Sequence, residues 1–260
     1  IKTPLDRLKP VVIGIAVLVA VVIGAVQLVP MNSYVPSIEK FASAHLKEPV
    51  SIGSMHVSIL GGFAINLQDI KIGTTQDVKI DKVSLSPEFG SVFGDVKIIR
   101  KVEVQSATVA EEVLPRLPGW LEAAVADRNL QISRIVVKSI KLESRTVKMP
   151  PFDADLQLST EGAIENAALS SADGKLSVGL TQHDNQIDIA LNAAKGWVPP
   201  LGPQIEFTDL TVKAVATHDR IRVEKFESLL YGGAAVGSAV IVWGGPWSIE
   251  GEVATERISL

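Results

Sequence analysis

Alternation of apolar and polar residues is the feature that most restricts how this chain folds. From Val50 onward, apolar side chains recur at every second position in runs of about five to ten residues, and most runs end at a glycine, a proline or a short polar patch. This pattern is typical of half-buried strands, and its spacing indicates consecutive antiparallel strands joined by short turns. The sequence therefore predicts a mainly β chain with about fourteen strands.

The clearest strand pair lies in the middle of the chain. Apolar residues alternate over 176–180 and again over 187–191, and residues 183–186 between them read as a polar turn. Elsewhere the alternation changes phase, once between Ile80 and Val83 and twice over 130–142. We interpret the two changes over 130–142 as β-bulges, which bend a sheet.

Two short segments have the helical period instead. The first lies between Pro36 and Pro49, with Ser37 as its candidate cap, and its apolar residues share one face: Ile38, Phe41, Ala42 and Leu46. We expect this face to pack on the first strands rather than on a bilayer, because it has few large side chains. The second lies within 111–128, and we expect it to plug or cap one end of the sheet.

This small amount of helix limits how the strands are covered. Most strands have one apolar face, and two short helices are not enough to cover a sheet of about fourteen strands. Either the sheet folds face to face as a closed sandwich or barrel, or it curls into an elongated groove with an apolar inner surface. The alternation fits both arrangements. The fold class we predict is an elongated, curled antiparallel sheet that forms a groove and follows a transmembrane helix.

The predicted transmembrane helix lies between Pro10 and Pro30. The nineteen residues 11–29 contain one polar side chain, Gln27, and a helix of that length spans ~29 Å, which matches the ~30 Å core of a bilayer. The stretch is too long for the apolar core of a cleaved signal peptide and lacks its cleavage site, so we expect an uncleaved anchor. Basic residues precede it and place the amino terminus in the cytoplasm: Lys2, Arg7 and Lys9.

This topology divides the chain into three parts. Residues 1–9 form a cytoplasmic tail, residues 10–30 the anchor, and residues 31–260 a β-groove domain outside the cytoplasm. Because the last residues read as a strand without a terminating loop, we expect the chain to be a fragment of a longer protein at its carboxyl end.

A search for chemistry gives no candidate for catalysis, a metal or a cofactor. The chain has no cysteine, which excludes disulfides, thiolate metal sites and a cysteine nucleophile. Its four histidines are far apart in the sequence. Asp153 and Asp155 share one strand face, and we interpret them as the solvated side of an amphipathic strand rather than as an acid/base or calcium pair. A net charge of −4 and scattered basic residues argue against nucleic-acid binding.

A family resemblance connects several of these features. The amino-terminal anchor is followed by IEKFASAHLKEPVSIG at 38–53 and by LQDIKIG at 67–73, and LLYGG at 229–233 precedes Gly237. This arrangement resembles the AsmA-like (AsmA/TamB-related) proteins of Gram-negative bacteria, many of which are much longer. The resemblance implies a single-pass inner-membrane protein whose periplasmic β-groove takes part in phospholipid transport between membranes and in outer-membrane homeostasis. It brings no catalytic residues.

The functional hypothesis is therefore a lipid groove and not an enzyme. Each buried acyl CH₂ contributes ~0.8 kcal/mol, so an apolar groove retains lipid tails while the headgroup stays wet. The expected partners are phospholipid acyl chains and the inner membrane. The candidate groove residues, which would serve equally in an ordinary core, are Ile65, Leu67, Ile80, Leu156, Leu158, Leu176, Val178, Leu180, Ile187 and Ile189.

The alternative belongs to another class of function. A sheet with an exposed strand edge also suits a scaffold or assembly factor that pairs with strands of outer-membrane or other envelope proteins. That hypothesis predicts binding of β-strand clients rather than retention of lipid.

Overall fold

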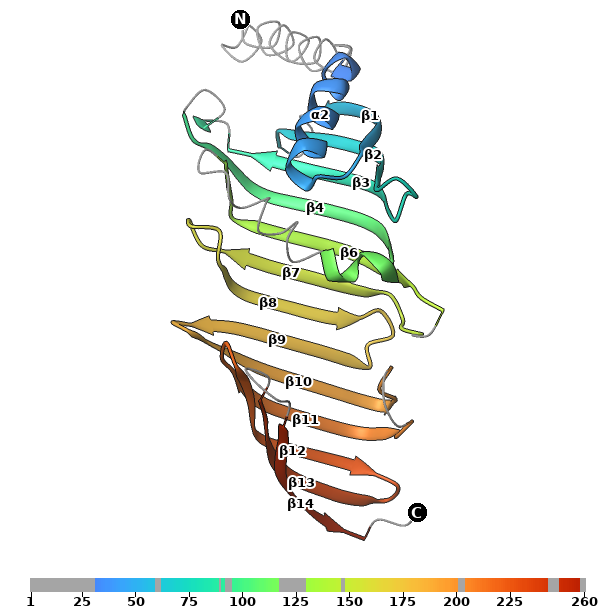
Figure 1. Ribbon diagram of the computed structural model, residues 1–260, viewed down its shortest axis with the longest axis vertical. Helices are drawn as coiled ribbons and strands as arrows, with labels where there is room; N and C mark the ends of the chain where they lie inside the picture. The colour runs from blue at the N-terminus through green and yellow to red at the C-terminus, as the bar shows by residue number, and fades with distance from the viewer. Residues whose placement is uncertain are drawn as a thin grey trace, which may run out of the picture.

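One sheet of fourteen strands forms most of the structure, a computed structural model that describes residues 31–58, 62–88, 90–91, 95–116, 130–145, 148–200, 204–242 and 248–257 (Figure 1). The predicted anchor at 10–30 lies outside these residues. Within them, no helix has the length and apolar character that a membrane crossing requires. The prediction of a mainly β chain is confirmed, as is the expected number of strands.

The strands follow one another across the sheet in chain order from β1 to β14, and β5 pairs beside this path with β4. Their bounds are β1 (Val50–Ser58), β2 (Ala64–Ile72), β3 (Val78–Pro87), β4 (Lys97–Ala110), β5 (Leu130–Ile132), β6 (Arg134–Glu143), β7 (Phe152–Leu158), β8 (Ile164–Ser171), β9 (Leu176–His183), β10 (Gln186–Trp197), β11 (Phe207–Ala216), β12 (Arg220–Leu230), β13 (Gly233–Val242) and β14 (Ser248–Glu256).

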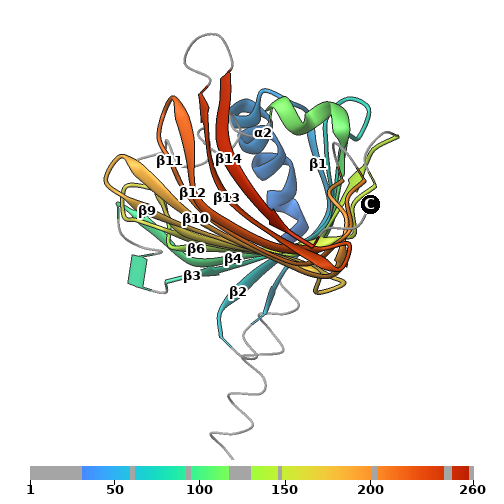
Figure 2. The same cartoon turned by 90° about the horizontal axis from the view of Figure 1, so that it is seen from below.

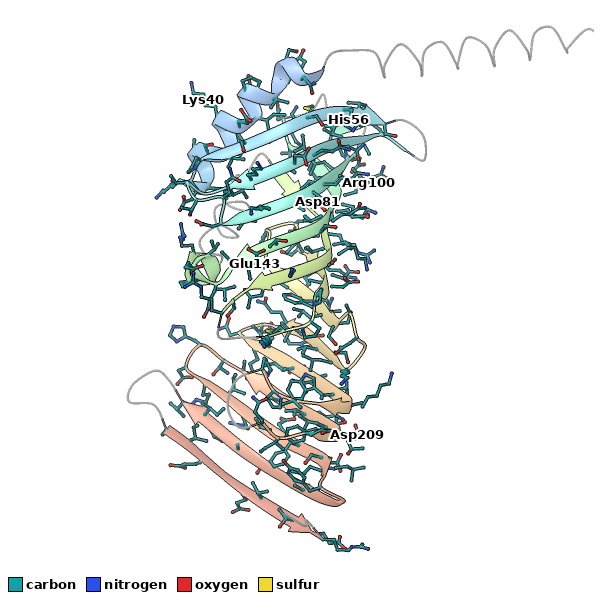
Figure 3. All side chains as sticks on the ribbon, turned by 90° about the vertical axis from the view of Figure 1, so that its right-hand side faces the viewer. Lys40, His56, Asp81, Arg100, Glu143 and Asp209 are labelled. Carbon is teal, nitrogen blue, oxygen red and sulfur yellow. The ribbon has the colours of Figure 1, made fainter. Side chains whose placement is uncertain are left out.

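The sheet is bent across its strands into a trough. Figure 2 shows the curved cross-section, with helix α2 (Val35–Leu46) on the concave side. Figure 3 shows the strands stacked along the long axis, from α2, which carries Lys40, to β11, which carries Asp209. Strands β1 and β14 lie at opposite ends of the pairing order, so the described strands form an open, curled sheet rather than a closed sandwich or barrel.

Most strand pairs are antiparallel, as expected, but the pairs that β4 makes with β5 and β6 are parallel. The expectation of consecutive antiparallel strands joined by short turns is therefore wrong here. The chain between β4 and β6 is long enough to return to the end at which β4 begins, which a parallel pair requires. Part of this connection is the 3₁₀ helix η3 (Glu111–Arg116), where a longer helix within 111–128 was predicted; residues 117–128 lie outside the described part.

Helix α2 packs on the sheet, as predicted. Its Val35 joins a buried cluster with Ile52, Leu67 and Ile70, and Ile38 packs against that cluster. The predicted cap is wrong: Ser37 lies inside the helix, and the N-cap residue, Tyr34, makes no side-chain capping bond. The predicted face is wrong at Phe41, which is 53% exposed, since the buried side of α2 runs through Val35 and Ile38.

Side chains from this amino-terminal segment also cover the outer edge of β1. Three backbone N–H groups of β1 donate hydrogen bonds to them: Val50 to Ser43 Oγ at 2.9 Å, Ile52 to Glu39 Oε1 at 2.7 Å, and Met55 to Asn32 Oδ1 at 3.0 Å. An uncovered strand edge invites pairing with another chain. The β1 edge is thus closed by its own chain.

A line of left-handed residues crosses the first strands. Asp69, Ser106 and Ser139 have φ of 53°, 55° and 59°. The cross-strand pairs formed by their sequence neighbours show that these three residues lie side by side across β2, β4 and β6, with Asp81 of β3 in the same row. A left-handed residue in a strand changes which face the following side chains occupy, as in a bulge. Both halves of β2, β4 and β6 therefore present apolar residues to the concave side. The phase change between Ile80 and Val83 in β3 lies in the same row, although Asp81 is not left-handed.

Candidate functional site

The candidate site is a continuous apolar face on the concave side of the sheet. It contains two ladders, each with one residue from every strand of the main path. The first ladder consists of Met55, Leu67, Val83, Val104, Val137, Ala154, Leu169, Val178, Leu191, Val212, Phe226, Gly237 and Val253. The second consists of Val57, Ile65, Leu85, Val102, Ile135, Leu156, Ala167, Leu180, Ile189, Ala214, Val223, Ala239 and Gly251.

Neither ladder contains a polar side chain, and we call the two ladders together the apolar face. At ~4.8 Å between strands, they extend roughly 60 Å across the sheet. Helix α2 shows that they lie on the concave side, because the cluster that it covers includes Leu67 of the first ladder (Figure 2).

Coverage of the apolar face differs along its length. Near α2, Val57 is 5% and Leu67 9% exposed. From β7 onward, the buried ladder residues are all alanines, Ala154, Ala167 and Ala214, while the larger side chains are partly exposed. A sealed core buries its large side chains first. Within the described residues, the face from β7 onward is thus an open apolar surface.

All ten predicted groove residues lie on this concave side. Ile65, Leu67 and Ile80 belong to the cluster beneath α2 and form an ordinary small core. The other seven lie between β7 and β10; Leu158 is buried at 9% exposure, whereas Ile187 is 40% exposed. Their binding of lipid stays a prediction.

A cavity of about 340 Å³ opens beside this part of the face. Its floor comes from β7, β8 and β9, and its other walls come from the loop before β7, the β8–β9 turn, the end of β10 and the residues that follow β10. The apolar lining residues are Met149, Pro150, Phe152, Leu169, Leu176, Val178, Trp197, Val198 and Pro200.

A bulge in β10 positions the tryptophan of this wall. Lys195 and Gly196 have φ of 58° and 73°, and the pairing with β11 shifts register between Ala194 and Trp197. The Trp197 ring then lies 6.1 Å, centroid to centroid, from Phe207 at a tilt of 36°. This distance is typical of favourable aromatic pairs. Gly196 suits the left-handed turn, because side chains other than glycine rarely adopt its φ of 73°.

Sequence reasoning missed most of this cavity. Met149 and Val198 lie in loops, Trp197 ends β10 after a bulge, and Leu169 lies on β8, whose sequence does not predict a strand. The available signal was the apolar run of Trp197 and Val198 before two prolines, an unusual composition for an exposed loop.

The opposite face of the sheet carries the charged residues. The Ser139 N–H donates to Asp153 Oδ1 at 2.9 Å, and Lys138 Nζ lies 3.1 Å from Asp153 Oδ2; these contacts lower the pKa of Asp153. The Arg134 guanidinium binds Asp155 through two bonds of 2.8 and 2.5 Å, which lowers the pKa of that carboxyl. Both carboxyls stay ionised in ion pairs, which suits the solvated side of a strand better than proton transfer.

Other polar clusters give no sign of catalytic or metal chemistry in the described ranges. His56 and His218 are exposed, and His183 Nδ1 lies 3.1 Å from Asp188 Oδ2 in a largely exposed pair. No group of three or more His, Asp or Glu side chains is arranged to hold a metal ion within these ranges.

Comparisons with family models, curated proteins and solved structures find no match to this chain. The function is therefore inferred from the geometry of the apolar face and its cavity.

Proposed function

We propose that this chain is an inner-membrane-anchored periplasmic protein that holds phospholipid acyl chains on its apolar face and takes part in phospholipid transport between membranes and in outer-membrane homeostasis. In this proposal it belongs with the AsmA-like proteins, residues 10–30 cross the inner membrane, and residues 31–260 lie in the periplasm. The observation that carries the proposal is the pair of uninterrupted apolar ladders that remain open from β7 onward.

The physical support comes from the chemistry of an acyl chain. A lipid tail has no hydrogen-bonding groups, so it matches a surface whose backbone polar groups are paired within the sheet and whose side chains are apolar. Each CH₂ that leaves water contributes ~0.8 kcal/mol. Because the ladders have no polar break, a tail gains similar energy at successive strands, and movement along the trough meets no large barrier.

The test compares two neighbouring positions on opposite faces of β10. Ile189 belongs to the apolar face, whereas Ala190 is exposed on the other face and pairs with Lys213. Full-length chain, purified in mild detergent, is analysed by native mass spectrometry for bound phospholipid. We expect the unmodified chain and Ala190→Asp to retain phospholipid, and Ile189→Asp to lose most of it, because a charge on this surface is costly to desolvate.

Two results would contradict the proposal. One is an unmodified chain that carries no phospholipid; the other is equal retention by both aspartate variants. If Ile189→Asp does not fold, as judged by circular dichroism, Ile189→Thr keeps the β-branched shape and introduces a smaller polar change. Its retention should fall between those of the unmodified chain and a non-binding variant.

The scaffold function has one observation in its favour. Strand β14 lies at the end of the sheet, pairs with β13, and has all nine residues exposed. Its exposed side chains include Glu250, Glu252 and Glu256, however, and charges on an edge strand oppose pairing with a further strand. Cross-linking from β14 that captures envelope β-proteins, in a chain that carries no lipid, would favour this alternative.

A further inference from the structure

The cavity beside β7–β10 joins an apolar chamber to a charged rim. Its apolar walls include Phe152, Leu169, Val178 and Trp197, and the charged residues that line it are Lys148, Asp173 and Lys175. About 340 Å³ is at the lower end of the range for small-molecule sites, enough for part of a lipid tail but not for a whole lipid. A ligand that fills it must continue outward past the charged residues.

Three hydrogen bonds position the charged groups on the β8–β9 side of the rim. The Asp173 carboxylate accepts hydrogen bonds from Ser171 Oγ at 2.6 Å and from the Lys175 backbone N–H at 3.1 Å. Lys175 is half-buried, and its Nζ donates to the Gly196 carbonyl oxygen at 3.4 Å, which holds the ammonium across the cavity toward the end of β10.

Asp173 keeps its negative charge in this setting. The Ser171 hydroxyl, followed by the Lys175 backbone N–H and the Lys175 charge, lowers the pKa of the Asp173 carboxyl. Lys148, which is exposed, faces the cavity from the loop before β7. The rim therefore presents two ammonium groups and one carboxylate beside an apolar chamber.

This arrangement of charges complements a zwitterionic phospho-amine headgroup. A phosphate carries the anion that two lysines attract, and a primary ammonium carries the cation and hydrogen-bond donors that a carboxylate binds. An anionic headgroup without an amine would be repelled by the negative charge of Asp173. A quaternary amine would give Asp173 a cation without an N–H donor.

We propose that this cavity is a binding site for an aminophospholipid, with the end of one acyl chain between Phe152 and Trp197, the phosphate at Lys148 and Lys175, and the primary amine at Asp173. The inference rests on the proposed lipid function and adds a fixed position on the trough with headgroup preference. Lipid elsewhere on the apolar face has no such charged group beside it in either ladder.

The test measures headgroup preference. Full-length chain in mild detergent is equilibrated with equal amounts of phosphatidylethanolamine, phosphatidylglycerol and phosphatidylcholine that carry the same acyl chains, and bound lipid is counted by native mass spectrometry. We expect phosphatidylethanolamine to exceed each of the others about three- to fivefold. The preference is modest because exposed charge pairs are weakened by water and salt.

Two variants and a matched control assign the preference to the rim. Asp173→Asn still accepts the bonds from Ser171 and Lys175, so the turn is kept while the charge is lost, and the ratio of phosphatidylethanolamine to phosphatidylglycerol should fall to about one or below. Lys148→Gln combined with Lys175→Gln should release the preferred lipid without emptying the apolar face. Asp184→Asn, in the turn at the other end of β9, should leave the ratio unchanged.

The outcomes separate this inference from the function on which it rests. Lipid that is bound without headgroup preference, or a preference that survives Asp173→Asn, overturns the aminophospholipid site and leaves the lipid trough in place. Stronger binding of phosphatidylglycerol by the unmodified chain also overturns it. No bound lipid of any kind overturns both.

Discussion

Glu39 on α2 accepts the backbone N–H of Ile52 on β1 at 2.7 Å, so a helix side chain occupies a position where a further strand would pair. Ser43 and Asn32 do the same for Val50 and Met55. The β1 end of the sheet is therefore closed to strand addition and the β14 end is not.

The first prediction tests this closure. Replacing Glu39 and Ser43 together by alanine should lower the free energy of unfolding by about 1 kcal/mol for each lost hydrogen bond. It should also cause concentration-dependent self-association, because it uncovers two N–H groups of an edge strand. Urea unfolding and sedimentation velocity provide the measurements. Glu39→Gln keeps a hydrogen-bond acceptor at this position and serves as the control. If Glu39→Gln also self-associates, the acceptor is not what protects the edge.

The second prediction concerns the bond between the Ser139 N–H and Asp153. Asp153→Ala removes the partner of a backbone N–H at the left-handed residue of β6, and we expect a loss of about 1 kcal/mol after allowance for its solvent exposure. Asp155→Ala removes an exposed pair with Arg134 and should have a smaller effect, because surface ion pairs contribute little. Urea denaturation compares the two variants. An equal or larger loss from Asp155→Ala would contradict this ranking.

Much of the local structure was predictable, because it depends on residues close together in the chain. The β9–β10 hairpin is confirmed with Leu180 opposite Ile189 and Val178 opposite Leu191. The phase change between Ile80 and Val83 was visible, but its alignment with Asp69 and Ser106 depends on the register between strands.

Other features had weaker signals. In strand β8 the apolar residues are Ile164 and the consecutive residues 167–169, so they do not alternate with polar residues as a strand pattern requires. The parallel pairing of β4 with β6 depends on the path of the chain that connects them. The alternation of apolar and polar residues carries no information on that path. The concave face was identified by residue pattern, whereas the cavity was missed because loops supply much of its wall.

The third prediction uses the pKa of Asp219. Hydrogen bonds from the Arg220 guanidinium and the Thr217 hydroxyl lower this pKa to about 2. Because the folded pKa lies below the unfolded value, the contribution to stability is complete above the unfolded value of about 4 and is lost as the pH falls through about 2. Carboxyl-detected NMR titration should give a midpoint near 2 for Asp219. Arg220→Gln should raise the midpoint toward the ordinary value, and an unchanged midpoint would exclude Arg220 as the main cause.

The last prediction tests the line of left-handed residues. Ser106 has a φ of 55°, a conformation that costs an L-residue roughly 1–2 kcal/mol and that glycine adopts freely. Ser106→Gly should therefore stabilise the chain by up to about 1 kcal/mol, and Ser106→Val should destabilise it, because a β-branched side chain fits this region poorly. Ser177→Gly, in an ordinary position of β9, should destabilise by about 0.5–1 kcal/mol. Thermal and urea unfolding measure all three. If both glycine variants destabilise equally, the left-handed residue is not a feature of the folded chain, and the continuity of apolar side chains across β1 to β6 loses its physical basis.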